Sequence, residues 1–338
     1  MRVTSLGSGS SGNALLVEAG PRRRTKLLID AGFPGRILCQ RLQQAGVTPT
    51  ELQGICITHE HTDHTIGLPW LAKHSTAFVI ADPRTLALLK QQFTAGVVYS
   101  DYGTPISLAA EGESVCDEPA LASFRSNGKA HYTVEPTQLA RISGPLELLE
   151  PLDLSEQATN FPSLPLDAGA RRVVGDIEII SFPVSHDAVA PCGYLLSASG
   201  CRVCVVIDSG EVTDTMLAAI SHADLLVIES NHDRERLLRG PYPQSLKQRI
   251  LSSTGHLSND QAADAILQTW RSDSVRWLWL SHLSRTNNTP RLAFNHLRQR
   301  IAAAGANLSQ AHISVLSPDP GAMWDSTQLW HSRSLWEM

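Results

Sequence analysis

Residues 55–64 read Ile55-Cys56-Ile57-Thr58-His59-Glu60-His61-Thr62-Asp63-His64, and this segment decides the fold prediction. Three imidazoles and two carboxylates fall within its last six residues, directly after an apolar run. Helical side chains share a face at spacings of three or four residues. His59 and His61 are two apart, so we expect a loop at the end of a strand. The pattern therefore differs from the helical His-Glu-x-x-His motif.

The donor atoms in this loop are those of a metal site. Imidazole nitrogens combined with a carboxylate suit zinc, and iron and manganese accept them as well. His59 and His61 can reach one cation while Asp63 and His64 reach a neighbouring one. A chance cluster of polar surface residues is the alternative, but the complete six-residue string favours a metal site.

Composition gives the broad class of the protein. With 338 residues, 42% of them hydrophobic and 18% charged, the chain has the make-up of an ordinary globular protein. We expect one domain over residues 1–338. The net charge of −5 gives no protein-wide attraction to nucleic acid. A polyanionic substrate would need a local cationic site, which bound metals would supply.

The chain shows no targeting or membrane signal. Met1-Arg2-Val3-Thr4-Ser5 does not resemble a secretion signal. No apolar run approaches the roughly eighteen residues of a membrane helix. We therefore expect a cytoplasmic protein without membrane association. Cys201 and Cys204 form a Cys-x-x-Cys motif within an apolar segment, where packing in a buried strand is favoured over redox chemistry.

Apolar runs predict two halves, each containing strands and helices. Such a pattern favours two sheets flanked by helices. Strands are expected at 15–18, 26–30, 78–81, 176–182, 193–197, 201–208, 224–230, 275–281 and 312–316. Helices are expected at 83–91, 212–220, 243–252, 259–271 and 290–303. Residues 103–172 lose periodicity and are interpreted as an insertion, and residues 320–338 as a C-terminal tail that packs on the body or on a partner.

The stretch Gly7-Ser8-Gly9-Ser10-Ser11-Gly12-Asn13 precedes the first expected strand. It is not a P-loop, because no Gly-Lys-Ser/Thr follows. A tight hairpin is favoured over direct contact with a phosphate. After the second strand comes Asp30, which is either a turn residue or, as we favour, an acceptor that orients a metal-bound histidine.

Three later segments place a metal-binding residue just after an apolar strand. They carry His186, Asp208 and His282. Side chains at strand ends rise from a rigid sheet toward one shared edge, where preorganised sites are built. Alone, each is equally compatible with a structural histidine or a turn aspartate. Together with the first loop they predict a site with two metals.

The order His-x-His-x-Asp-His, followed by His, Asp and His after successive strands, resembles the metallo-β-lactamase fold hydrolases. The resemblance is closest to the YycJ-type (WalJ) branch, which is thought to contain nucleases. It is carried by residues 9–13, 185–188, 229–233 and 255–259. It implies an α/β fold with four αββα layers and two divalent cations, Zn²⁺ or Mn²⁺. It assigns His59, His61 and His186 to one cation. It assigns Asp63, His64 and His282 to the other, with Asp208 bridging.

The sequence is also similar to ribonuclease Z, and Glu229 and His256 fall at that family's Glu and His positions. The implied function is a phosphodiesterase or nuclease acting on DNA or RNA through a hydroxide held between the metals, since metal-bound water titrates near pH 7. His256 is the expected general acid, with Glu229 holding its other nitrogen, and packing at a helix start is its alternative role. Asp63 completes the expected catalytic group.

Several polar residues near these positions are candidates for contact with the substrate. Ser258 and Gln261 form a capping box, so a helix begins there and its N-terminal amides favour a nearby phosphate. The predicted substrate contacts are Ser258, Asn259, Asn231 and Asn287. A basic group between Glu229 and His256 is either a solvated face or a grip on backbone phosphate. It consists of Arg234, Arg236, Arg239, Lys247 and Arg249.

Two other classes of function remain open from the sequence. One is hydrolysis of a small cyclic phosphodiester, thioester or lactone. The Gly-His-Thr-Pro-Gly type of string expected in thioester hydrolases of this fold is absent around His186. The other is a non-catalytic binding protein, against which the complete ligand set argues.

Overall fold

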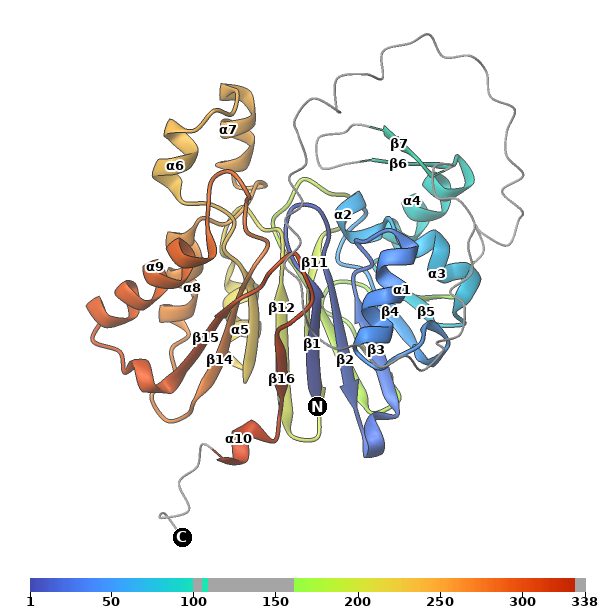
Figure 1. Ribbon diagram of the computed structural model, residues 1–338, viewed down its shortest axis with the longest axis horizontal. Coiled ribbons are helices and arrows are strands. Elements are labelled where there is room, and N and C mark those ends of the chain that lie inside the picture. Colours follow the sequence, from blue (N-terminus) through green and yellow to red (C-terminus); the bar gives the residue numbers. More distant parts are fainter. Residues whose placement is uncertain (100–104, 109–160, 332–338) are drawn as a thin grey trace, which may run out of the picture.

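The computed structural model describes residues 1–99, 105–108 and 161–331. Within them, two seven-stranded sheets face each other and carry helices on their outer faces (Figure 1). This is the αββα sandwich that the sequence predicts.

The first sheet contains the N-terminal strands and one strand from near the C-terminus. In spatial order its strands are β16 (Met323–Asp325), β1 (Arg2–Gly7), β2 (Ala14–Ala19), β3 (Thr25–Ile29), β4 (Gly54–Cys56), β5 (Phe78–Ala81) and β8 (Ser163–Pro165). β16, β1, β2 and β3 pair antiparallel, whereas β3, β4, β5 and β8 pair parallel. The carboxyl ends of β3 and β4 therefore meet at the same edge.

The second sheet is built from the later part of the chain. Its strands are, in spatial order, β15 (Ala311–Val315), β14 (Arg276–Ser281), β13 (Leu225–Glu229), β12 (Cys201–Val206), β11 (Cys192–Ala198), β10 (Ile177–Pro183) and β9 (Arg171–Val174). β12 to β15 are parallel, and β10 also runs in their direction because β11 is antiparallel to both β10 and β12. The ends of β10, β12, β13 and β14 thus share one edge.

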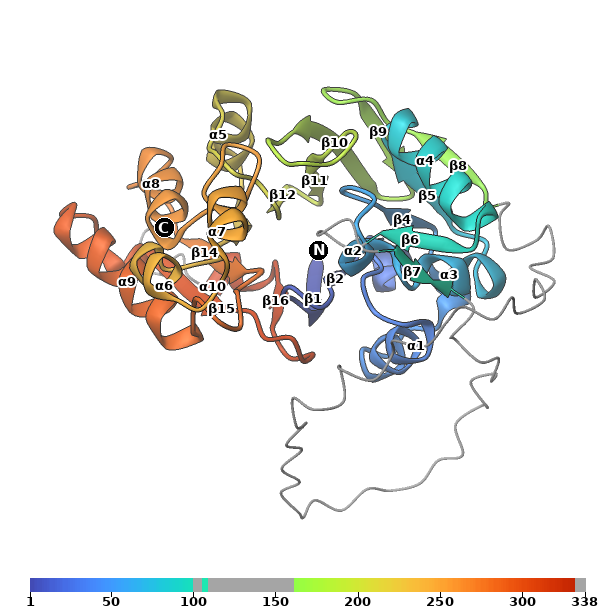
Figure 2. The same cartoon turned by 90° about the horizontal axis from the view of Figure 1, so that it is seen from above.

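Helices cover the outer face of each sheet, as Figure 2 shows from above. The first half contributes α1 (Gly35–Gln44), α2 (Thr62–Thr65), α3 (Leu68–His74) and α4 (Pro83–Thr94). The second half contributes α5 (Asp214–Ser221), α6 (Arg234–Arg239), α7 (Gln244–Ile250), α8 (Asn259–Gln268), α9 (Pro290–Ala303) and α10 (Gln328–His331). Short 3-10 helices occur at Pro21–Arg23, Pro49–Glu51 and Leu308–Gln310, and β6 (Val97–Tyr99) and β7 (Pro105–Ser107) form a separate ribbon. Among the described helices, none has the length and apolarity needed to cross a membrane.

The main core lies between the two sheets. Val17 on β2 belongs to the same buried cluster as Ile179 on β10 and Tyr194 on β11. Side chains of β12 alternate between the two faces of the sheet. Val203 belongs to this cluster, whereas Cys204 packs in the cluster under α5 and α8. Cys204 and Cys201 are both buried free thiols, as expected for packing residues. Each fully buried aliphatic side chain contributes about 1.5–3 kcal/mol of transfer free energy.

The predicted insertion and tail are described only in part. Residues 109–160 and 332–338 lie outside the described residues. At the end of the range 103–172, β8 pairs with β5, and β9, which begins there, pairs with β10, each as an edge strand. In the tail, β16 pairs with β1 and its Trp324 is fully buried. These parts of both segments therefore belong to the sandwich.

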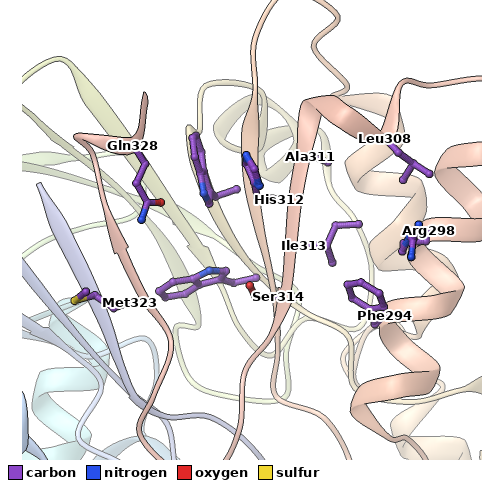
Figure 3. Close-up of a pocket in the computed structure, with 11 residues that line it drawn as sticks. Phe294, Arg298, Leu308, Ala311, His312, Ile313, Ser314, Met323 and Gln328 are labelled. Atoms are coloured by element: carbon purple, nitrogen blue, oxygen red, sulfur yellow. The ribbon is translucent and has the colours of Figure 1, made fainter. Parts of the chain in front are cut away.

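A cavity of about 480 Å³ lies beside edge strand β15. Figure 3 shows Phe294 and Arg298 of α9 on one side and Met323 of β16 on the other, with Ser314 of β15 between them. None of its lining residues belongs to the predicted metal site.

Candidate metal centre

The seven predicted ligands converge at the edge where the parallel strands end. All seven are buried. His59 and His61 lie between β4 and α2, Asp63 and His64 lie in α2, and His186, Asp208 and His282 follow β10, β12 and β14. The fold therefore brings together residues that are more than 200 positions apart in the sequence.

The first ligand group consists of three imidazoles. Nε2 of His59 lies 3.0 Å from Nδ1 of His61, and that Nδ1 lies 3.3 Å from Nε2 of His186. Each residue presents one nitrogen to the same small volume. This is the trio that the resemblance assigns to one cation.

The second group contains Asp63, His64, Asp208 and His282. Oδ2 of Asp63 lies 3.4 Å from Nε2 of His64 and 3.4 Å from Nε2 of His282. Oδ2 of Asp208 lies 2.8 Å from His64 Nε2 and 3.5 Å from His59 Nε2. Asp208 thus touches both groups, which is the geometry of a bridging ligand.

Unpartnered buried atoms test whether these residues fit a cation. Among the residues that the structure describes, no hydrogen-bond partner is found for the two buried carboxylate oxygens of Asp208 or for the buried Nε2 of His282. Buried polar atoms normally have partners, because leaving one unpaired costs about 1–3 kcal/mol. A carboxylate and an imidazole nitrogen that converge without hydrogen bonding are instead the donors that divalent cations prefer. The residues fit, and we conclude that the site binds divalent metal.

Asp30 and Thr58 hold the histidines of both groups. Oδ2 of Asp30 lies 2.7 Å from Nδ1 of His64, while Oδ1 accepts hydrogen bonds from the backbone N–H and the hydroxyl of Thr58. The Thr58 hydroxyl lies 3.0 Å from Nδ1 of His59. Such contacts fix the tautomer and leave Nε2 for a metal. The contact to His64 is the one predicted for Asp30.

Glu229 connects the metal centre to His256. Its Oε1 accepts from Nδ1 of His256 at 2.8 Å and from Nδ1 of His282 at 2.9 Å. Its Oε2 accepts from the backbone N–H groups of Ser209 and Leu257 at 3.0 and 3.1 Å. Nδ1 of His256 also lies 3.3 Å from Asp208 Oδ1. The predicted pairing of Glu229 with His256 is therefore present, right beside the second ligand group.

Three of the site residues have a left-handed backbone. Asp30, Asp208 and His282 have φ values of 59°, 60° and 53°. Non-glycine residues rarely adopt this conformation, and it costs of order 1–3 kcal/mol each. Each follows a strand end: Asp30 comes after β3, Asp208 after β12 and His282 after β14. The surrounding structure thus stabilises a conformation that the sequence alone would not favour.

Burial and neighbouring charges set the protonation states of the site. Burial holds the pKa of His59 well below its usual range, which favours the neutral ring that binds metal. Burial alone would raise the pKa of Asp208, but His282 and His64 hold it well below its usual value. Burial would lower the pKa of His256, yet Glu229 and Asp208 raise it to about 10. The two carboxylates therefore favour the protonated ring of His256.

The four predicted substrate contacts have different environments. Asn231 helps to line a small cavity of about 30 Å³ together with His256 and His282. The Ser258 hydroxyl caps α8, and Asn259 accepts from the hydroxyl of Ser230. Asn287 is buried, and its side-chain atoms have no partner within the described parts of the chain. Only Asn231 of the four lines this cavity, and all four assignments remain predictions.

The basic group between Glu229 and His256 is largely engaged within the protein. Lys247 donates to the carbonyl of Leu238 at 2.8 Å, and Arg239 pairs with Glu235 at 2.6 Å. Arg249 pairs with Asp187 at 2.6 Å beside the small cavity. Arg236 contacts the Thr286 carbonyl, while Arg234 is exposed. Both roles considered for this group, a solvated face and contact with backbone phosphate, stay predictions.

Sequence reasoning missed two residues that touch the ligands. Thr58 contacts both His59 and His64, and Asn13 places its side-chain nitrogen 3.3 Å from Nε2 of His64. Thr58 directly precedes His59, so its position in the sequence could have indicated a contact with the histidines. Asn13 lies in the glycine-rich stretch, where a hairpin was expected. The hairpin is present, and it also reaches the metal centre.

Comparison with known proteins defines the class. Residues 7–110 match the metallo-beta-lactamase superfamily model, and residues 121–276 match the beta-lactamase superfamily domain model. The chain belongs to the metallo-beta-lactamase superfamily.

Within that superfamily, the chain is similar to two proteins named as exodeoxyribonucleases. It is 31% identical to Exodeoxyribonuclease WalJ of Streptococcus pneumoniae over 90% of this chain and 89% of that protein. It is 30% identical to Exodeoxyribonuclease YycJ of Bacillus anthracis over 95% and 96% of the two chains. Among solved structures, Zn²⁺-bound PqqB from Methylobacterium extorquens has a TM-score of 0.59 at 14% identity, covering 96% of this chain and 100% of that one. At this identity the structural match supports the fold alone.

Proposed function

We propose that this protein is a metal-dependent phosphodiesterase that hydrolyses DNA, using two Zn²⁺ or Mn²⁺ ions. The observation that carries the proposal is the placement of His256. It is held by Glu229 and lies beside Asp208, the residue that touches both ligand groups. The names of the WalJ and YycJ relatives support DNA as the substrate.

The two ligand groups would hold one cation each. His59, His61 and His186 would bind the first, and Asp63, His64 and His282 the second, with Asp208 between them. Two cations bound there would supply Lewis acidity toward the phosphoryl oxygens and a water that loses its proton near neutral pH.

Residues of the chain then orient the reacting groups and transfer protons. We assign to Asp63 the uptake of a proton from the attacking water. Its Oδ2 faces His64 and His282, and its Oδ1 is buried with no hydrogen-bond partner within the described residues. Glu229 fixes Nδ1 of His256 and so leaves Nε2 to protonate the departing oxygen. General acid catalysis of this kind contributes about 10²–10⁴-fold to a rate.

The cavity beside His256 is consistent with its role as the general acid. It is also lined by Ser10, Asn231 and Tyr242, and its volume of about 30 Å³ suits a water or a single phosphoryl oxygen. The leaving oxygen would approach His256 from this side.

The test uses purified protein loaded with Mn²⁺ or Zn²⁺ and four substrates. The four are end-labelled DNA, in single- and double-stranded form, the matching RNA, bis-p-nitrophenyl phosphate and a chromogenic thioester. We expect cleavage of DNA and of the nitrophenyl phosphodiester, with loss of both in EDTA. Hydrolysis of the thioester alone would place the protein among the small-molecule hydrolases. Tight metal binding with no hydrolysis of any substrate would favour a binding role.

A further inference from the structure

The loop between β1 and β2 lies directly against the second ligand group. Asn13, at its end, is 1% exposed. Its backbone N–H donates to the carbonyl of Asp63 at 2.8 Å, and its own carbonyl accepts from Gly32 at 3.0 Å. The loop is therefore anchored to the histidine-rich segment by main-chain hydrogen bonds.

The hydrogen bonds of Asn13 define which way its amide points. Oδ1 accepts from the backbone N–H of Gly9 at 3.1 Å and from the hydroxyl of Ser8 at 3.0 Å. Because both partners are donors, this atom is the oxygen, and the nitrogen faces the opposite direction. That direction is the metal centre.

Nδ2 of Asn13 carries two N–H groups. One donates to the carbonyl of Gly9 at 3.2 Å. The nitrogen also lies 3.5 Å from Oδ2 of Asp63 and 3.3 Å from Nε2 of His64, so the other N–H is available to the second ligand group. Since Asp30 holds Nδ1 of His64, Nε2 is the nitrogen that faces a cation. A cation on Nε2 leaves the Asp63 carboxylate as the acceptor for the amide N–H. Asn13 therefore donates to the oxygen of Asp63 that faces His64 and His282.

Ser8 connects Asn13 to His282, another residue of the second ligand group. Its hydroxyl donates to Oδ1 of Asn13 and accepts from the backbone N–H of His282 at 3.0 Å. The pair Ser8 and Asn13 thus links Asp63, His64 and His282. Within the described residues, the hydrogen bonds of Ser8 and Asn13 reach this second group and none of them reaches His59 or His186.

We infer that Asn13, supported by Ser8, is a positioning residue for the second cation alone. This inference rests on the metal centre of the proposed function. Polar groups that orient metal ligands change metal affinity by about 10–100-fold when removed. Loss of the Asn13 amide therefore lowers the affinity for the second cation by about 10–100-fold. The affinity for the first cation does not change.

The experiment is a calorimetric titration of metal-free protein with Mn²⁺ alone, combined with DNA cleavage at increasing Mn²⁺. Wild type is expected to bind two ions. Asn13→Ala is expected to bind one ion as wild type does and the second about 10–100-fold more weakly, with DNA cleavage restored by excess Mn²⁺. Asn295→Ala, at an exposed position on α9, is the control and should match wild type.

Ser8→Ala is the second variant, for the case in which Asn13→Ala does not fold. It should weaken the same binding event. If a folded variant binds both ions with wild-type affinity, or binds both ions more weakly by the same factor, the inference is overturned. Neither result would argue against the metal centre itself. Wild type that binds no pair of ions would instead contradict the proposed function itself.

Discussion

The carboxylate of Asp30 lies 2.7 Å from Nδ1 of His64, although the two residues are 34 positions apart. The contact is buried on both sides, and the Thr58 hydroxyl completes it. It turns Nε2 of His64 toward Asp63 and Asp208, so an interaction outside the ligand set determines the shape of the second group.

Replacing Asp30 tests this relationship. We expect Asp30→Ala to lower metal affinity by about 10–100-fold, because the ring of His64 loses its orientation. Equilibrium dialysis followed by metal analysis gives the affinity. Asp273→Ala, at an exposed aspartate, serves as the control. Unchanged affinity in Asp30→Ala would mean that the ring is held by packing alone.

His256 is expected to act on the leaving group and to contribute little to metal binding. His256→Gln should retain both metals and lose about 10²–10⁴-fold of turnover, because proton transfer is removed. Metal content and kcat on labelled DNA are measured on the same preparation. If the metal content falls in proportion to activity, His256 is a ligand. Donor atoms of Asp208, Glu229, His256 and His282 lie close enough together to form such a site.

Gly32 gives a prediction about packing beneath the histidine loop. A Cβ atom at Gly32 would lie 1.6 Å from the carbonyl oxygen of Asp63, whereas at Gly321 it would meet nothing within 4 Å. We expect Gly32→Ala to destabilise the fold by about 1–3 kcal/mol or more through overpacking. Gly321→Ala should behave as wild type. Thermal unfolding of the two metal-free variants makes the comparison, and equal melting temperatures would contradict it.

Asp176 predicts a pH dependence far from the metal centre. Hydrogen bonds from Arg24 and Thr25 lower the pKa of Asp176 to about 2. A carboxyl with a lowered folded-state pKa stabilises the protein above its ordinary pKa of about 3.9, and this contribution is lost as the pH falls toward the folded value. Asp176→Asn should therefore melt below wild type at pH 7, with the difference narrowing as the pH falls from about 4 toward 2. A difference that is constant over this range would exclude the carboxylate as its cause.

Local chemistry made much of the fold predictable. The helix expected at 83–91 begins at Pro83, and Asp82 caps it by accepting from the N–H of Arg84. The capping box of Ser258 and Gln261 is also confirmed. Strand β5 at Phe78–Ala81 and helix α9 at Pro290–Ala303 have the predicted bounds. In the two caps, neighbouring residues supply both partners of the interaction, whereas β5 was predictable from its short apolar run.

Features that depend on distant partners were not predictable in the same way. Strand β16 is three residues long and becomes a strand only by pairing with β1. Asn13 carries no local mark of its contact with Asp63, which is 50 positions away. The seven side chains that meet at this edge could be selected from the sequence, because the histidine loop limits the possible chemistry and the later residues follow apolar strands. Their assignment to two cations came from the family resemblance.

Two cations held by seven buried side chains would be directly visible in crystals grown with Mn²⁺, by anomalous diffraction. We predict one peak among His59, His61 and His186 and a second among Asp63, His64 and His282, with Asp208 in contact with both. A map with no peak at these residues, or with a peak only elsewhere, would show that they do not hold a pair of cations.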